Sequence, residues 1–223
     1  MILYKYRSLA NFEHVLDIIL NQRLYCSTYP ELNDPFEGIF ETRIHSRMIS
    51  IQSKSYQKAE DFFEGEIDKI KICSLSSDLN DVRLWPYYAD GHKGIVLGID
   101  FSELERIYEV KYPEKLPSSG WWDYAIALGG PSIHIDNIYE ILSHKTKHWE
   151  FESEHRIIDE SKYLEEGKYF NIKDRIKAIY LGTRTSDKYR DLLKQIVQDK
   201  IPFWTTKINH EKVIVEPDKL VEG

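Results

Sequence analysis

The stretch W-E-F-E-S-E-H-R, residues 149–156, alternates acidic and aromatic side chains and then places an arginine in the acidic phase. Side chains of a β-strand point alternately to opposite faces, so we expect Trp149 to Arg156 to form a strand with one packing face and one charged face. The expected charged face consists of Glu150, Glu152, Glu154 and Arg156. Like charges on one strand face repel each other, and this predicts a positive group opposite the carboxylates.

The residues alone leave two interpretations of Glu152 and Glu154 open. A solvated edge-strand face, neutralised by Arg156 and a lysine, needs no function. A carboxylate pair in a cleft can instead hold sugar hydroxyls, stabilise an oxocarbenium-like centre or bind a metal. His144 and His148 are four residues apart, but neither an H-E-x-x-H motif nor a third ligand accompanies them, so we expect no metal site.

The composition is that of an ordinary globular protein. The chain has 223 residues, of which 42% are hydrophobic and 30% charged, and a net charge of −7. This length suits a single domain over residues 1–223. The acidic balance argues against nonspecific nucleic-acid binding by the whole surface. Cys26 and Cys73 are far apart and form no metal-type pair, and the sequence has no signal-peptide pattern or membrane-length apolar run, so we expect a cytoplasmic protein without a membrane partner.

Hydrophobic periodicity predicts strands interspersed with helices. Strands are expected over 2–7, 23–28, 70–76, 95–99, 108–112, 176–181, 203–206 and 212–215. Helices are expected over 8–20, 55–69, 135–143 and 186–198, with a short helix within 78–90 and a long loop over 116–131. Because regular helical crossovers do not join the strands, we expect an α+β fold rather than a doubly wound one.

A second informative stretch is W-P-Y-Y-A-D-G-H-K-G, residues 85–94. It gathers aromatic and basic side chains around one helix end, including Trp85, Tyr87, Tyr88 and His92. Core packing explains Trp85 and one tyrosine, whereas aromatic and basic groups together also favour contact with an anion or a nucleotide. No P-loop, Rossmann fingerprint or G-x-S-x-G elbow occurs in the sequence.

Five segments in order resemble a bacterial family of domains of unknown function, family 2971. They are Y-K-Y-R-S-L at 4–9, N-D-P-F-E at 33–37, W-x-x-Y-A-D-x-H-K-G at 85–94, K-T-x-x-W-x-F-E-x-E-x-R at 145–156 and I-Y-L-G at 179–182. More distantly, Arg7 on the first strand, a serine-rich strand at 74–76 and E-S-E at 152–154 are similar to the order found in ADP-ribosyltransferases of the R-S-E type. That resemblance implies two small packed β-sheets, surrounded by helices, around an NAD cleft.

The resemblance also implies roles for individual residues. Glu154 would hold the nicotinamide ribose hydroxyl and stabilise the oxocarbenium-like centre as nicotinamide leaves, which is chemistry that a carboxylate suits. Glu152 would orient or deprotonate the acceptor. The expected cofactor-binding residues are Arg7, Ser74, Ser76, Tyr87, Tyr88 and His92.

The function implied by the resemblance is that of an ADP-ribosyltransferase-like protein, a bacterial toxin or phage-defence effector. It would use NAD as a substrate to modify an unknown acceptor, either a protein or a nucleic acid. Two alternatives stay open: a non-catalytic nucleotide- or protein-binding module of the same fold, and a glutamate-dependent nuclease or hydrolase.

Overall fold

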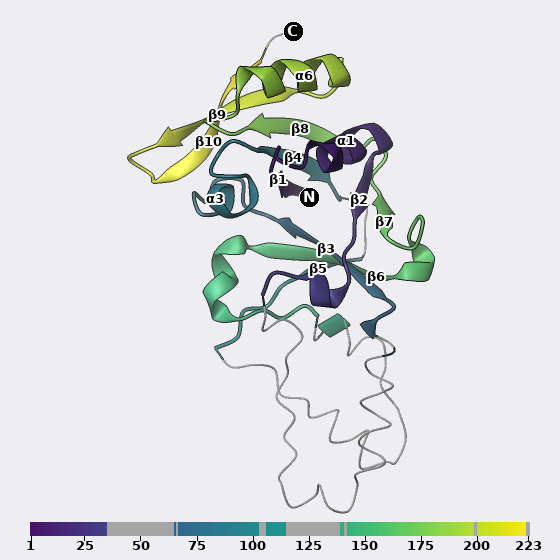
Figure 1. The fold of residues 1–223 in the computed structure, drawn as a ribbon. Helices are drawn as coiled ribbons and strands as arrows, with labels where there is room; N and C mark the ends of the chain where they lie inside the picture. The colour runs from purple at the N-terminus through teal and green to yellow at the C-terminus, as the bar shows by residue number, and fades with distance from the viewer. Residues whose placement is uncertain are drawn as a thin grey trace, which may run out of the picture.

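The structure is a computed structural model that describes residues 1–34, 65, 67–102, 106–114, 139–140, 142–198 and 200–221. A mixed eight-stranded sheet of order β10-β9-β8-β4-β1-β3-β6-β5 dominates it, and β2 and β7 form a second, two-stranded sheet (Figure 1). The strands are β1 (Ile2–Arg7), β2 (Arg23–Tyr25), β3 (Ile70–Ser76), β4 (Ile95–Asp100), β5 (Ile107–Glu109), β6 (Glu154–Glu160), β7 (Tyr169–Asn171), β8 (Ile176–Leu181), β9 (Phe203–Asn209) and β10 (Ile214–Leu220). The principal helices are α1 (Phe12–Asn21), α3 (Leu84–Tyr88), α6 (Asp187–Val197) and the 3-10 helix η2 (Lys147–Glu152).

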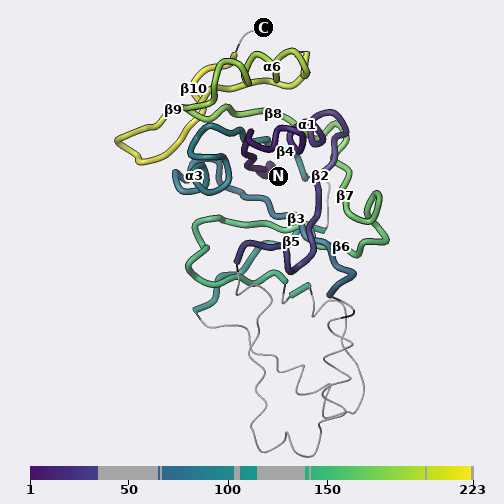
Figure 2. Tube along the Cα trace, in the orientation of Figure 1, coloured from purple at the N-terminus to yellow at the C-terminus, as the bar shows by residue number. Residues whose placement is uncertain are grey.

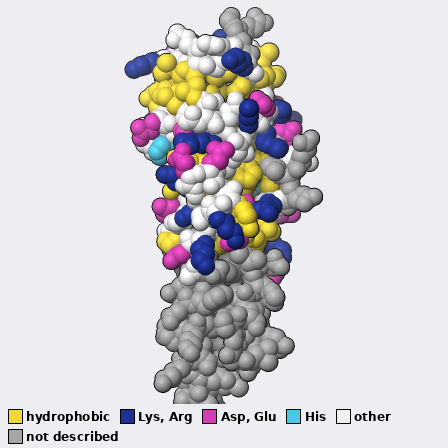
Figure 3. All heavy atoms as spheres, turned by 90° about the vertical axis from the view of Figure 1, so that its right-hand side faces the viewer, with side chains coloured by type: hydrophobic (Ala, Val, Ile, Leu, Met, Phe, Trp, Pro, Cys, Tyr) yellow, Lys and Arg dark blue, Asp and Glu magenta, His cyan; other side chains and the backbone are white. Residues whose placement is uncertain are grey.

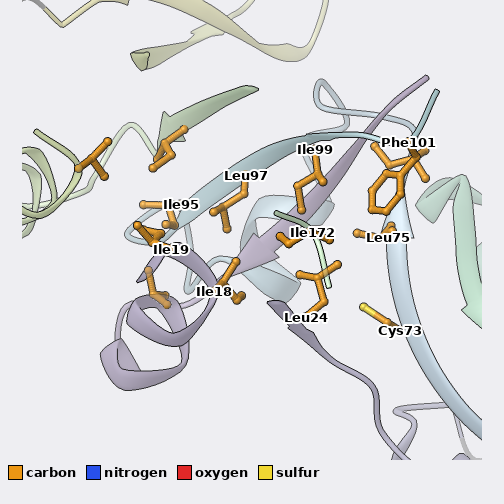
Figure 4. Close-up of a cluster of buried hydrophobic side chains, with 14 of the residues drawn as sticks. Ile18, Ile19, Leu24, Cys73, Leu75, Ile95, Leu97, Ile99, Phe101 and Ile172 are labelled. Atoms are coloured by element: carbon orange, nitrogen blue, oxygen red, sulfur yellow. The ribbon is translucent and has the colours of Figure 1, made fainter. Parts of the chain in front are cut away.

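The central strands of the large sheet are covered on both faces. One face packs against α1 through a cluster that includes Ile18, Ile95 and Leu97 (Figure 4). The other face packs against α3 through Tyr6, Trp85 and further buried residues. Strands buried on both faces are rich in apolar residues rather than strictly alternating, and this explains the I-V-L-G-I-D sequence of β4, whose first five residues are all buried.

The large sheet is nearly split between β1 and β3. On one side, β1 pairs with β4 over six residues, from Ile2↔Asp100 to Arg7↔Ile95. Towards β3 it pairs only at Tyr4↔Ser76. Further along the same edge, β3 pairs instead with the segment after β2, at the isolated bridge Ser27↔Ile72. The strands β1 and β3 therefore diverge between these two bridges.

The C-terminal part of the sheet contains a strand-helix-strand unit. Strands β8 and β9 are parallel, with Ile179 opposite Phe203, and α6 connects them as parallel pairing requires. The tube in Figure 2 follows this path from β8 through α6 to β9 and the antiparallel β10. The helix predicted over 186–198 is thus confirmed, with Ser186 and Gln198 as its flanking residues.

The α+β class is confirmed, but the expected pair of small sheets takes a different form. Hydrogen bonding makes one eight-stranded sheet whose halves meet at a single residue pair, together with the small β2–β7 sheet. Five predicted strands have other bounds in the structure. The strand predicted over 23–28 ends at Tyr25, and the one predicted over 108–112 is the shorter β5. Strands β4 and β9 extend beyond the expected ranges, and β10 begins and ends later than expected. The helices predicted over 55–69 and 135–143 lie mostly outside the described residues, and the loop predicted over 116–131 lies wholly outside them.

The strand predicted over 149–156 is half wrong. Lys147–Glu152 forms the 3-10 helix η2, Ser153 adopts a left-handed conformation with φ 45°, and β6 begins only at Glu154. Glu150 is consequently exposed and pairs with Lys147, so it does not share a face with Glu152 and Glu154. The expected faces are also reversed, because Glu152, Glu154 and Arg156 are buried, whereas Trp149 and Phe151 are only partly buried.

Among the described helices, none is long and apolar enough to cross a membrane. On the face drawn in Figure 3, basic and acidic side chains are interspersed over the described part of the chain. Nonspecific nucleic-acid binding needs a continuous basic footprint, and the described residues on this face do not form one.

Candidate functional site

A cavity of about 290 Å³ lies where β1 and β3 diverge. Its lining includes Arg7 from β1, Ser74 and Ser76 from β3, and Glu154 from β6. These positions are far apart in sequence, and the antiparallel pairing of β3 with β6, which sets Ser76 opposite Glu154, brings the last three together. The volume is close to the lower limit of about 300 Å³ for small-molecule pockets.

The β1 side of the cavity is cationic. Lys5 and Arg7 both line it, and Lys5 is buried. Lys5 Nζ donates a hydrogen bond of 2.6 Å to the carbonyl oxygen of Ser74. Ser74 lies on β3 between Ile72 and Ser76, where β1 has separated from β3. Arg7 Nε is buried without a hydrogen-bond partner among the described residues. A guanidinium is always charged, and a buried unpaired donor costs free energy, so this end of the cavity favours an anionic ligand.

The opposite side holds a network of two carboxylates and two cations. Lys145 Nζ lies 2.6 Å from Glu152 Oε2 and 3.2 Å from Glu154 Oε2. Arg156 donates to Glu154 through Nε at 2.8 Å and Nη2 at 3.0 Å, and its Nη1 donates to the Leu142 carbonyl at 2.6 Å. The side chains of the four network residues are at most 6% exposed. The positive groups predicted opposite the carboxylates are therefore Lys145 and Arg156.

The two glutamates differ in their remaining capacity to accept hydrogen bonds. Glu154 accepts two from Arg156 and one from Lys145, and the Ser74 hydroxyl further lowers its pKa as a hydrogen-bond donor. A carboxylate has about four acceptor positions, so Arg156 and Lys145 alone occupy three of those on Glu154. Glu152 accepts from Lys145 and from the hydroxyl of Tyr88. It also lines the cavity, and two of its acceptor positions stay open in the contacts of the described residues.

Burial and charge shift the two carboxyl pKa values in opposite directions. Burial alone raises the pKa of Glu154, but the adjacent Arg156 and Lys145 outweigh it and hold this pKa at about 2. Burial dominates at Glu152 and raises its pKa, against the effect of Lys145. Glu154 is thus a fixed negative charge, whereas Glu152 takes up a proton more readily than an exposed glutamate does.

We expect the network to weaken in acid. The pKa of folded Glu154 lies below the unfolded value of 4.5, so its stabilising contribution is present above about pH 4.5 and is lost as the pH falls towards about 2. Glu152 acts in the opposite sense, because a raised folded pKa removes stability as the pH rises through it. Denaturant unfolding between about pH 5 and pH 2 should give a shallower loss for Glu154→Gln than for the wild type. Equal slopes would contradict this account, and Glu150→Gln serves as the matched exposed control.

Three residues of the segment at 85–94 were expected to bind the cofactor. Tyr88 lines the cavity, whereas Tyr87 and His92 do not. Tyr87 is 66% exposed, and its ring contacts Trp149 and Phe151. His92 stacks on Trp85 with ring centroids 5.8 Å apart. Both residues therefore make ring contacts outside the lining of the cavity.

The glycines of the H-K-G and I-Y-L-G segments have a structural explanation. A Cβ on Gly94 would lie 2.2 Å from the Arg7 carbonyl oxygen, and one on Gly182 would lie 2.2 Å from the His92 carbonyl oxygen. Only glycine permits such close backbone approaches. The turn after α3 therefore packs directly against the end of β1, and this contact positions Arg7 at the cavity.

Sequence reasoning missed Lys145 and Tyr112. Lys145 bridges both carboxylates, and the Tyr112 hydroxyl accepts a hydrogen bond from the Glu154 backbone N–H at 2.8 Å. Lys145 opens the K-T-x-x-W-x-F-E-x-E-x-R segment, so its presence there was an available signal. Among the described residues, no group of three or more histidine, cysteine, aspartate and glutamate side chains is arranged to hold a metal ion.

In comparisons with protein-family models, with curated proteins and with solved structures, no significant match to this chain is found.

Proposed function

We propose that the cavity between β1 and β3 binds the ADP-ribose part of NAD, and that the protein is an ADP-ribosyltransferase-like enzyme. The observation that supports this most strongly is the shared lining: Arg7, Ser74 and Glu154 come from three strands and line one cavity. This is the arrangement that the R-S-E resemblance implies. The acceptor is a separate protein or nucleic acid.

The charge distribution supports the orientation of the ligand. Arg7 Nε, which lacks a partner among the described residues, and Lys5 favour the pyrophosphate at the β1 side. The ribose attached to nicotinamide then lies towards the glutamates. In this arrangement the cavity of about 290 Å³ holds the pyrophosphate and the ribose attached to nicotinamide. The other parts of NAD extend outside the cavity.

The open acceptor positions of Glu152 support a ligand-facing role for this residue. In our proposal Glu152 accepts a hydrogen bond from the ribose, and ionised Glu154 supplies fixed negative charge behind it. When the N-glycosidic bond breaks, nicotinamide leaves with the bonding electron pair and the ribose carbon becomes cationic. Nearby carboxylates stabilise that charge, and the nucleophile of the acceptor then forms the new bond to the same carbon.

A second candidate function, a non-catalytic nucleotide-binding module, is favoured by one specific observation. Lys145 and Arg156 balance Glu152 and Glu154 when both carboxylates are ionised. A neutral network stabilises a ribosyl cation less than an unpaired carboxylate does. Binding of ADP-ribose without any release of nicotinamide from NAD would identify this module.

We expect Arg7→Gln to weaken ADP-ribose binding by about 10- to 100-fold, since a hydrogen bond to a charged group contributes about 1.5–3 kcal/mol. Isothermal titration calorimetry with ADP-ribose measures the effect. The matched control is Arg190→Gln on α6, where the arginine is 37% exposed, pairs with Asp187 and does not line the cavity.

Two results would contradict the proposal. One is the absence of ADP-ribose binding to the wild-type protein at millimolar concentration, and the other is equal affinity of the wild type and Arg7→Gln. Thermal unfolding of each variant separates a local loss of affinity from a loss of the fold.

A further inference from the structure

Cys26, in the segment just after β2, lies across from Cys73 on β3. Ser27 and Ile72 exchange two backbone hydrogen bonds, of 2.8 and 2.9 Å, and the bridge between them is antiparallel. One position further along, Cys26 faces Cys73 as a non-hydrogen-bonded pair, for which the Cα atoms are about 4.5 Å apart. Disulfides join Cα atoms about 4.4–6.8 Å apart, so the backbone permits a bond here.

The surroundings favour reaction between the two thiols. The two thiols are close enough to shift each other's pKa in opposite directions. Cys26 Sγ donates a hydrogen bond to the Leu24 carbonyl at 3.7 Å, and Lys5 Nζ donates one to Cys73 Sγ at 3.5 Å. Both cysteines are 1% exposed, within the hydrophobic cluster where Figure 4 draws Cys73. The neighbouring Cys26 thiol and the charge of Lys5 lower the pKa of Cys73 to about 6, against the effect of burial. The thiolate is the reactive form of a cysteine, so we expect Cys73 to react with an oxidant before Cys26 does.

We propose that Cys26 and Cys73 form a reversible intramolecular disulfide in response to a small peroxide. The Cys73 thiolate attacks one oxygen of hydrogen peroxide, the O–O bond breaks, and protonated hydroxide leaves as water, which yields a sulfenic acid. Cys26 then attacks that sulfur, the S–O bond breaks, and a second water leaves. Two thiols are oxidised to one disulfide while one peroxide is reduced to two waters.

The disulfide would join two walls of the cavity. Tyr25 and Ser27 flank Cys26, Ile72 and Ser74 flank Cys73, and all four neighbours line the cavity. Lys5, whose Nζ contacts Cys73 Sγ, also lines this cavity, and a water-sized oxidant would approach Cys73 from there. A bond at this place fixes the segment after β2 against β3, beside the site proposed for the nucleotide. Formation of this disulfide requires no particular ligand in the cavity.

Intact mass spectrometry after treatment with hydrogen peroxide tests the proposal. We expect a loss of two hydrogen atoms, no alkylatable thiol after denaturation, a Cys26–Cys73 linked peptide, and full reversal by dithiothreitol. Hydrogen exchange at 25–28 and 70–74 should slow in the oxidised protein. The melting temperature should rise by about 5 °C or more, because the bond closes a long loop in the unfolded chain.

The variants Cys26→Ser and Cys73→Ser are the matched controls, since each retains one thiol. With Cys26→Ser, peroxide should convert Cys73 to sulfinic acid, which dithiothreitol does not reverse. Three outcomes in the wild type would overturn the proposal: two thiols that remain alkylatable, irreversible oxidation of either cysteine, or a disulfide between two molecules. Mass spectrometry reads these outcomes without any nucleotide, so they are distinct from a failure of ADP-ribose binding.

Discussion

Glu154→Gln is expected to lower the free energy of unfolding by about 3 kcal/mol, because it leaves Arg156 and Lys145 with too little negative charge in a buried site. Glu154 accepts hydrogen bonds from both cations, and all three side chains are at most 5% exposed. Denaturant unfolding followed by circular dichroism measures the loss. A change below about 0.5 kcal/mol would show that the network does not hold a buried charge.

The chain offers a control and a further test of this expectation. Glu150 is 55% exposed and pairs with Lys147, so Glu150→Gln should change stability by less than about 0.5 kcal/mol. Replacing Glu154 and Arg156 together with Gln and Met should cost less than the sum of the two single substitutions, since removing both partners leaves no unpaired charge at this pair.

Glu152→Gln is expected to reduce the release of nicotinamide from NAD by at least about 100-fold, with the fold retained. The amide cannot supply the negative charge that answers the developing ribosyl cation. The fold persists because Lys145 keeps its contact with Glu154 and because the Tyr88 hydroxyl can still donate to an amide oxygen. Chromatographic measurement of nicotinamide, together with thermal unfolding, separates the two effects.

Glu150→Gln is again the matched control, two residues away on η2 and exposed. It should release nicotinamide at the wild-type rate. If the wild type releases nicotinamide and Glu152→Gln does so equally fast, the proposed role of Glu152 is wrong. If the wild type releases none while it binds ADP-ribose, the non-catalytic binding module is the better account.

Two of the strands that line the cavity, β1 and β3, were predictable from local sequence. Ile2–Arg7 and Ile70–Ser76 match the predicted ranges, because runs of β-branched and aromatic residues between polar segments are strong strand signals. The divergence of these two strands was not predictable. It depends on the single pairing Tyr4↔Ser76 and on the distant bridge Ser27↔Ile72, which no local pattern records.

The charged stretch at 149–156 illustrates the limit of periodicity. The alternation correctly predicted that the carboxylates meet positive charge, but it placed them on a strand face that begins too early. Ser153 adopts a left-handed conformation, and buried Lys145 contacts both Glu152 and Glu154. Glu152 therefore belongs to the same network as Glu154. Tertiary contacts of this kind override a two-residue period.

The proximity of Cys26 and Cys73 was likewise not predictable from the sequence. Cys26 and Cys73 were expected to form no pair of the metal-binding type, which concerns their spacing along the chain. Their contact follows from the strand register after β2.

A crystal structure of the protein with ADP-ribose tests the central claim most directly. We expect the ligand between β1 and β3, with a phosphate oxygen within hydrogen-bond distance of Arg7 Nε and a ribose hydroxyl bonded to Glu152. An ADP-ribose molecule bound elsewhere, or an unoccupied cavity in crystals saturated with the ligand, would contradict the account.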